Sequence, residues 1–137
     1  MRIETRRLLD HRMKKYILAI GDALTLLIVT LIGFTTHGES KLSFLPRMAA
    51  TYIPLLVAWF LLAPWMQLFD AKINSNLKQF WRPALTMLFA GPLAVVLRGL
   101  FLNAPIIPIF AVVLSATSAL GLMIWRVVFL FWNRKVR

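Results

Sequence analysis

The stretch at residues 16–37, YILAIGDALTLLIVTLIGFTTH, is long and apolar enough to cross a bilayer, yet it contains a carboxylate, Asp22. A run of about 18 or more apolar residues is typical of a transmembrane helix. An ionisable side chain inside such a helix is costly unless a partner faces it, because hydrocarbon does not solvate charge. The sequence therefore has to supply a partner for Asp22 from another part of the chain.

Three further apolar stretches follow, and together with the first they predict an all-α integral membrane bundle of four helices. Hydrophobic residues make up 60% of the 137 residues, above the roughly 45–50% of soluble domains. The expected spans are residues 16–36, 48–69, 82–102 and 106–132. A basic segment at residues 1–15 precedes them and a basic tail at residues 133–137 follows.

The lysines and arginines outside the spans predict the orientation of the bundle. Six lie in residues 1–15, three in the link that follows the second span and three in the tail, whereas the opposite loops hold only Lys41 and Arg47. By the positive-inside rule, this distribution predicts both termini on the cytoplasmic side of the inner membrane. Aromatic residues expected at the same side agree with this orientation: Tyr16, Trp65, Trp81 and Trp132.

The net charge of +11 would favour nucleic acid as the partner of a soluble protein. Here the charges flank apolar spans, so we expect anionic lipid headgroups as the partner and no nucleic acid. The residues expected to bind headgroups are Arg6, Arg7, Arg12, Lys14 and Lys15. A short helix on the membrane surface would fit residues 1–15, and the following span lacks an A-x-A-like cleavage site, which favours an uncleaved anchor.

Depth in the membrane selects the partner of Asp22. Asp22 lies six residues after Tyr16, and Arg126 lies six residues before Trp132, so both are expected about 9 Å inward from the cytoplasmic aromatic belt. An ion pair of Asp22 with Arg126 would fix the order of the helices. Two alternatives remain open at this point: a proton- or ion-coupled role for Asp22, and an Arg126 side chain that extends to the interface instead.

The second arginine inside a span, Arg98, is expected near the opposite face of the membrane. There it matches the segment that carries His37 and Glu39. Arg98 can serve as an interface anchor or as part of an anion site. His37 could ligate a metal, but a metal site needs several ligands and the chain has only one other histidine, on the other side.

Two tryptophans, Trp59 and Trp125, lie deeper than the aromatic belt. They can pack in the bundle or line a slot for a pigment or quinone. The chain has no Cys, no H-E-x-x-H, no G-x-S-x-G and no pair of acids within the spans. We therefore expect no enzyme activity, no metal site and no cofactor.

The ordered polar landmarks resemble a known family. Gly21-Asp22 is followed by Gly33 ahead of Thr36-His37-Gly38, then by Pro54 with Trp59, by Arg98, and by Trp125-Arg126. This order is similar to that of the small bacterial membrane proteins filed as domain of unknown function 3054, over about residues 16–130. A basic residue often follows the glycine in that family, whereas Phe34 stands there in this chain. The resemblance implies a four-helix membrane fold and no assigned activity.

These observations favour a non-catalytic membrane subunit or scaffold that works with other membrane subunits or as a homo-oligomer, because four helices enclose little volume. A small proton-coupled transporter that uses Asp22 is the alternative from another class. A pigment- or quinone-binding accessory subunit that uses His37 and the tryptophans is a third hypothesis.

Overall fold

The computed structural model describes residues 1–38 and 41–136, and over these ranges all regular structure is helical. The elements in chain order are α1 (Arg2–Thr36), η1 (Leu42–Phe44), α2 (Leu45–Leu62), η2 (Ala63–Met66), α3 (Ala71–Asn74), η3 (Leu77–Gln79), α4 (Trp81–Leu102) and α5 (Pro108–Val136). Four helical segments are long and apolar enough to cross a membrane. The predicted all-α fold is confirmed for the described residues, with four helices that are long and apolar enough to span a membrane.

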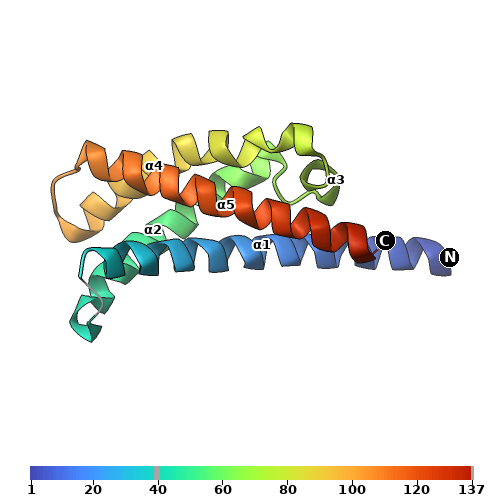
Figure 1. Ribbon diagram of the computed structural model, residues 1–137, viewed down its shortest axis with the longest axis horizontal. Helices are drawn as coiled ribbons and strands as arrows, with labels where there is room; N and C mark the ends of the chain where they lie inside the picture. Colours follow the sequence, from blue (N-terminus) through green and yellow to red (C-terminus); the bar gives the residue numbers. More distant parts are fainter. Residues whose placement is uncertain (39–40, 137) are drawn as a thin grey trace.

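The four long helices pack as a bundle in which α4 lies between α2 and α5, and α1 contacts both α2 and α5. Both termini and α3 lie at one end of the bundle, which we call the basic end (Figure 1). Residues 37–38, 41–44 and 103–107 lie at the other end, which we call the opposite end. The three basic segments of the sequence therefore meet at one end, as the charge distribution predicted.

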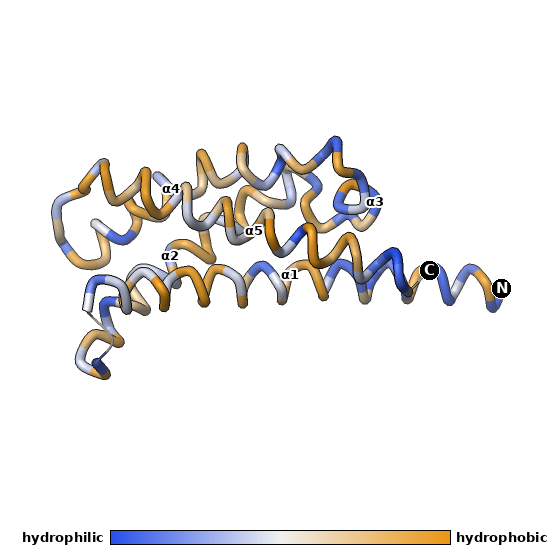
Figure 2. The backbone as a smooth tube through the Cα atoms, in the orientation of Figure 1, coloured by the Kyte–Doolittle hydropathy of each residue, from blue (hydrophilic) through white to orange (hydrophobic). Residues whose placement is uncertain are grey.

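Apolar residues run through the middle of the bundle, and hydrophilic residues gather at the basic end (Figure 2). Many large apolar side chains on the long helices are exposed, including Ile20, Leu61 and Phe89. Exposure of this kind is expected of helices that face lipid rather than water. The four predicted belt residues, Tyr16, Trp65, Trp81 and Trp132, are likewise exposed.

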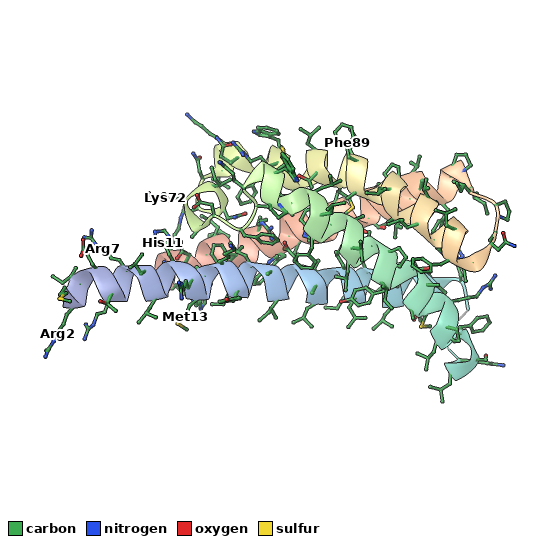
Figure 3. The ribbon with its side chains drawn as sticks, turned by 180° about the vertical axis from the view of Figure 1, so that it is seen from behind. Arg2, Arg7, His11, Met13, Lys72 and Phe89 are labelled. Carbon is green, nitrogen blue, oxygen red and sulfur yellow. The ribbon has the colours of Figure 1, made fainter. Side chains whose placement is uncertain are left out.

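The first helix differs from the expectation of a separate surface helix over residues 1–15. Instead α1 is one uninterrupted helix of 35 residues, about 52 Å long, which exceeds the roughly 30 Å of a hydrocarbon core. Its first turns, with Arg2 and Arg7, extend beyond the end of α5 (Figure 3). Helix formation continues because this segment contains neither Pro nor Gly before Gly21.

The second and fourth spans have bounds that differ from the predicted ones. The α2 helix ends at Leu62, and Pro64 lies in the 3₁₀ turn η2, since proline lacks the N–H that would continue the α-helix. The left-handed backbone of Gln67 (φ 56°) then reverses the chain. At the other end, Asn103 is left-handed (φ 48°), and α5 begins at Pro108 rather than at residue 106.

The polar link between α2 and α4 is folded and contacts both α1 and α5 through α3. Asp70 caps α3 by accepting a hydrogen bond from the N–H of Lys72 (2.9 Å). Asn74 is buried and donates to the carbonyl of Leu68 (2.7 Å), and Asn133 of α5 donates to Ser75 Oγ (2.7 Å). These bonds hold the link against the basic end of the bundle.

Two glycines allow helices to approach closely. A Cβ placed on Gly21 of α1 would lie 2.0 Å from the Trp125 ring of α5, and one placed on Gly91 of α4 would lie 1.8 Å from Ser115 Oγ. Small residues at helix contacts are typical of membrane bundles, where close packing replaces the hydrophobic drive for association.

Candidate functional site

The Asp22 carboxylate and the Arg126 guanidinium form a two-pronged ion pair between α1 and α5. Arg126 Nη1 donates to Asp22 Oδ1, and Nη2 donates to Oδ2 at 3.0 Å. Asp22 is fully buried and Arg126 is 1% exposed. The predicted pair is present, and Arg126 does not extend to the interface.

Two further groups complete what we call the buried polar cluster, which consists of Asp22, Arg126, Trp59 and the Leu68 carbonyl. Trp59 of α2 donates its indole N–H to Asp22 Oδ2 at 3.0 Å. Arg126 Nη2 also lies 3.3 Å from the Leu68 carbonyl, which the reversal at Gln67 brings into the interior. The cluster therefore joins α1, α2, α5 and the start of the polar link.

The side chains of the buried polar cluster lie in the interior of the bundle, where Asp22 and Trp59 are 0% exposed and Arg126 is 1% exposed. The buried face of α1 runs in steps of four residues through Leu18, Asp22 and Leu26, and Leu55, Leu122 and Phe129 of the core are fully buried. Every oxygen of the carboxylate has a donor. These hydrogen bonds replace the water that the carboxylate loses on burial, whereas Arg126 Nε is buried without a hydrogen-bond partner among the described residues.

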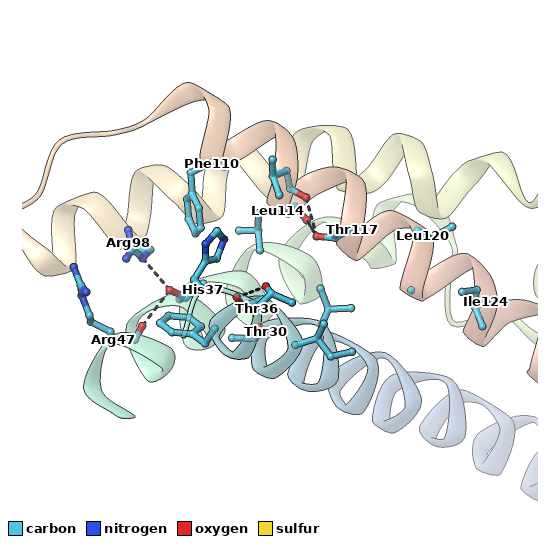
Figure 4. A pocket seen from close by; sticks show the side chains of 17 residues that line it. Thr30, Thr36, His37, Arg47, Arg98, Phe110, Leu114, Thr117, Leu120 and Ile124 are labelled. Atoms are coloured by element: carbon cyan, nitrogen blue, oxygen red, sulfur yellow. Dashed lines mark hydrogen bonds between the residues drawn. The ribbon is translucent and has the colours of Figure 1, made fainter. Parts of the chain in front are cut away.

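A second polar region is a half-open cavity of about 580 Å³ at the opposite end of the bundle, which we call the open pocket (Figure 4). Its polar lining includes Thr30, Thr36, His37, Arg47, Thr51, Arg98 and Thr117. Its apolar lining includes Val29, Phe34, Phe110, Leu114, Leu120 and Ile124. Its volume lies within the roughly 300–1,000 Å³ of small-molecule sites.

Arg98 is the half-buried arginine of the open pocket. Its Nε donates to Thr51 Oγ1 of α2 at 2.8 Å, and its guanidinium lies 4.9 Å from the centre of the Phe110 ring. His37 and Arg47 line the same pocket. Arg98 and His37 therefore line the same cavity, whereas Glu39, the other residue expected near Arg98, lies outside the described residues.

The open pocket lies where α1 and α5 diverge. The two helices are close at Gly121, where an added Cβ would lie 2.9 Å from Val29 Cγ2. From this point towards the opposite end, α5 separates from α1 (Figure 1). The pocket fills this fork, and lining residues Ile32, Leu120 and Ile124 are each more than half exposed.

The structure separates the residues of the predicted pigment or quinone slot. Trp59 is fully buried and bonded to Asp22, and the Trp125 ring lies against Gly21. His37 follows the end of α1, fifteen residues and about 22 Å along the helix axis from Asp22. His37 lines the open pocket, whereas neither Trp59 nor Trp125 is among the described residues that line it.

Four of the five residues predicted to bind headgroups, Arg6, Arg7, Arg12 and Lys15, are exposed on α1. Lys14 differs, because it is 9% exposed and forms an ion pair with Asp10 one turn away (2.9 Å). Its position on the inward face of α1, one turn from Leu18, accounts for this burial.

Sequence reasoning missed Trp59 as a partner of Asp22, although a usable signal was present. Trp59 lies six residues before Trp65 of the aromatic belt, the same separation that matched Asp22 with Arg126. The Thr51 hydroxyl and the Leu68 carbonyl carried no comparable signal. A hydroxyl or a backbone carbonyl becomes a partner only through the packing of the helices.

Comparison with known proteins agrees with the polar landmarks. The family model described as "Protein of unknown function (DUF3054)" matches residues 19–129, which contain both the buried polar cluster and the open pocket. No curated protein and no solved structure matches the chain. The chain therefore belongs to the DUF3054 family of proteins of unknown function.

Proposed function

We propose that the protein is a non-catalytic membrane subunit or scaffold that works in an assembly, either with copies of itself or with other membrane subunits. The observation that carries this proposal is the closure of the buried polar cluster. Asp22 is fully buried, and both of its oxygens accept hydrogen bonds from Arg126 and Trp59. Its charge is used to hold the helices together.

A proton-coupled transporter that uses Asp22 is the rival proposal, and the same geometry disfavours it. A coupling carboxylate has to exchange protons with water in the course of transport, so it faces a cavity or a water-filled path. Asp22 does not line the open pocket, and its carboxylate is surrounded by the core. Releasing it would require breaking the ion pair and the bond to Trp59.

We place the protein in the cytoplasmic membrane with both termini inside the cell. The support is that the three basic segments lie at one end of the bundle, which satisfies the positive-inside rule with four spans. The exposed arginines on the first turns of α1 extend beyond α5 at this end and can contact anionic headgroups or an acidic partner.

Cross-linking in native membranes followed by mild extraction and native mass spectrometry tests the assembly. The expected result is a homo-oligomer or co-purified membrane subunits. Recovery of a monomer alone, with no cross-linked neighbour, would contradict the proposal.

Proton flux across the membrane of proteoliposomes tests the transporter hypothesis. We compare the wild type with a double variant, Asp22→Asn with Arg126→Gln, which removes both charges and keeps hydrogen-bonding groups. We expect no proton flux above that of protein-free vesicles for either protein. A flux that the wild type supports and the folded double variant lacks would establish the transporter instead.

A further inference from the structure

The first part of α1, residues 2–15, continues the helix beyond the rest of the bundle, and we call it the extension. Tyr16 is the predicted belt residue of α1, and Arg2 lies fourteen residues, or about 21 Å, further out along the helix. The headgroup layer on one side of a bilayer is about 5–8 Å thick. Because α1 runs through this segment without a break, its first turns extend past the headgroups of the proposed membrane into water.

One face of the extension points away from the bundle and carries both cationic and apolar side chains. Arg2, Arg6, Leu9 and Met13 repeat at spacings of four, three and four residues, so at about 100° per residue they lie within about 60° of one another. All four are exposed. Arg2 and Met13 point away from the other helices, whereas Arg7 points to the side on which the bundle lies (Figure 3). We call these four residues the outer face.

The outer face contains arginines and no acid. The extension has two acids, and Glu4 lies about 160° around the helix from Arg2. The other, Asp10, forms the ion pair with Lys14. Among the described residues, neither Arg2 nor Arg6 forms an ion pair. A partner that fits this face therefore supplies carboxylates for the arginines and apolar groups to cover the leucine and the methionine.

Distance from the membrane and charge decide among the possible partners. Leu9 and Arg6 lie about 10 and 15 Å outward from Tyr16, beyond the headgroup layer, so lipid in a flat bilayer does not cover them. A second parallel copy of the chain would place Arg2 and Arg6 against the same arginines, and like charges repel. Nucleic acid would pair with the arginines but would leave Leu9 and Met13 uncovered. An acidic protein segment satisfies both kinds of side chain.

We propose that the outer face of the extension binds an acidic amphipathic helix of a partner protein in the water beside the membrane. The spacings of four, three and four residues are those of a coiled-coil seam, so the partner helix lies along α1 with its apolar stripe on Leu9 and Met13. Its carboxylates pair with Arg2 and Arg6. The inference rests on the proposed membrane location of the bundle, but not on the proposed assembly, since one chain presents the whole outer face.

The test uses the full chain in nanodiscs of neutral phosphatidylcholine, with one chain per disc. The probe is a fluorescent helical peptide whose leucines repeat at spacings of three and four residues with glutamates beside them. The control probe has the same composition in scrambled order. Fluorescence anisotropy measures binding, and we expect the helical peptide to bind in preference to the scrambled one. Equal binding of the two peptides, or no binding, would overturn the proposal.

Matched variants locate the binding to the outer face. Arg2→Gln with Arg6→Gln should weaken binding of the helical peptide at least about threefold. Arg7→Gln with Lys15→Gln removes the same charge from other faces of the extension and should have a smaller effect. Equal losses would mean that the peptide senses only net charge, which contradicts a defined face.

The apolar part of the outer face has its own control, because two exposed leucines are neighbours in the sequence. Leu9 lies on the outer face, whereas Leu8 lies about 100° away around the helix. We expect Leu9→Ala to weaken binding of the helical peptide and Leu8→Ala to leave it unchanged, with thermal unfolding used to confirm that each variant is folded. A loss no greater for Leu9→Ala than for Leu8→Ala would contradict the proposed seam.

A spin label distinguishes a protein partner from lipid. The chain has no cysteine, so Leu9→Cys accepts a single label. In nanodiscs of phosphatidylglycerol without peptide, we expect this label to remain accessible to a water-soluble nickel chelate. A label shielded in the lipid would overturn the proposal in favour of a membrane-bound segment. Because each disc holds one chain, peptide binding supports the docking even if the proposed assembly fails.

Discussion

The buried polar cluster and the open pocket each contain an arginine from within a span, but the two arginines have opposite surroundings. Arg126 is 1% exposed, and the core closes around its pair with Asp22. Arg98 is half-buried and lines a cavity of about 580 Å³. A charge inside a membrane helix therefore does not identify a ligand site by itself. A ligand site also requires a cavity beside the charge, which Arg98 has and Arg126 lacks.

The largest expected effect comes from removing the Arg126 charge. Arg126→Met leaves the Asp22 carboxylate buried with Trp59 as its only remaining side-chain donor among the described residues. Breaking a buried pair from one side costs about 3–5 kcal/mol, because the remaining charge is uncompensated. We expect little folded protein, measured as a much lower thermal midpoint in detergent than that of the wild type. A thermal midpoint equal to that of Arg98→Met would contradict the prediction that the charge of Arg126 matters more for stability than the charge of Arg98.

Substitution of one glycine near each region compares how tightly the two regions are packed. Gly21→Ala forces a Cβ towards the Trp125 ring, and overpacking of this kind costs about 1–3 kcal/mol. Gly33→Ala adds the same methyl group beside the open pocket, where no atom lies within 4 Å. We expect Gly33→Ala to be neutral or stabilising by up to about 1 kcal/mol, since alanine favours helix over glycine. Thermal unfolding of both variants measures the difference, and equal midpoints would contradict it.

The indole of Trp59 is expected to contribute less than the arginine. Trp59→Phe keeps an aromatic ring and removes the N–H that Asp22 Oδ2 accepts, so we expect a loss of about 1–2 kcal/mol. Trp65→Phe is the matched control, because Trp65 is 84% exposed. Chemical unfolding in mixed micelles measures the free energy of unfolding of both variants. A loss no greater for Trp59 than for Trp65 would mean that Trp59 acts only by packing.

The smallest effect on stability is expected at the open pocket. Arg98→Gln removes the bond to Thr51 and the contact with the Phe110 ring at a half-buried site. We expect a loss of less than about 1 kcal/mol in the free energy of unfolding. Unfolding of the wild type and of this variant in the same detergent checks this value. A loss as large as that of Arg126→Met would show that Arg98 is part of the structural core.

Depth and charge were sufficient to predict the architecture and the central pair. Four apolar stretches gave four helices, and equal separations from the aromatic belt matched Asp22 with Arg126 across α1 and α5. Such reasoning works because a helix rises by a fixed distance per residue and the membrane supplies a common reference plane. The same separation from the aromatic belt matches Trp59 with Asp22, but from the sequence we expected Trp59 only to pack in the bundle or to line a slot for a pigment or quinone.

The open pocket and the folded link could not be predicted in this way. The pocket exists because α1 and α5 diverge beyond Gly121, and no sequence pattern encodes the angle between two helices. The link depends on the left-handed Gln67, on the local bonds of Asn74 to the Leu68 and Asp70 carbonyls, and on the bond from Asn133 of α5 to Ser75. The continuity of α1 was missed because charge, rather than helix propensity, was used to divide it at residue 15.

The central claim is that Asp22 and Arg126 act as one structural unit, and a double-mutant cycle tests it most directly. The unfolding free energy is measured for Asp22→Asn, for Arg126→Gln and for the double variant. We predict that each single change is strongly destabilising and that the double variant recovers most of the loss, with a coupling of about 3 kcal/mol or more. Single losses that simply add, with a coupling near zero, would contradict the account.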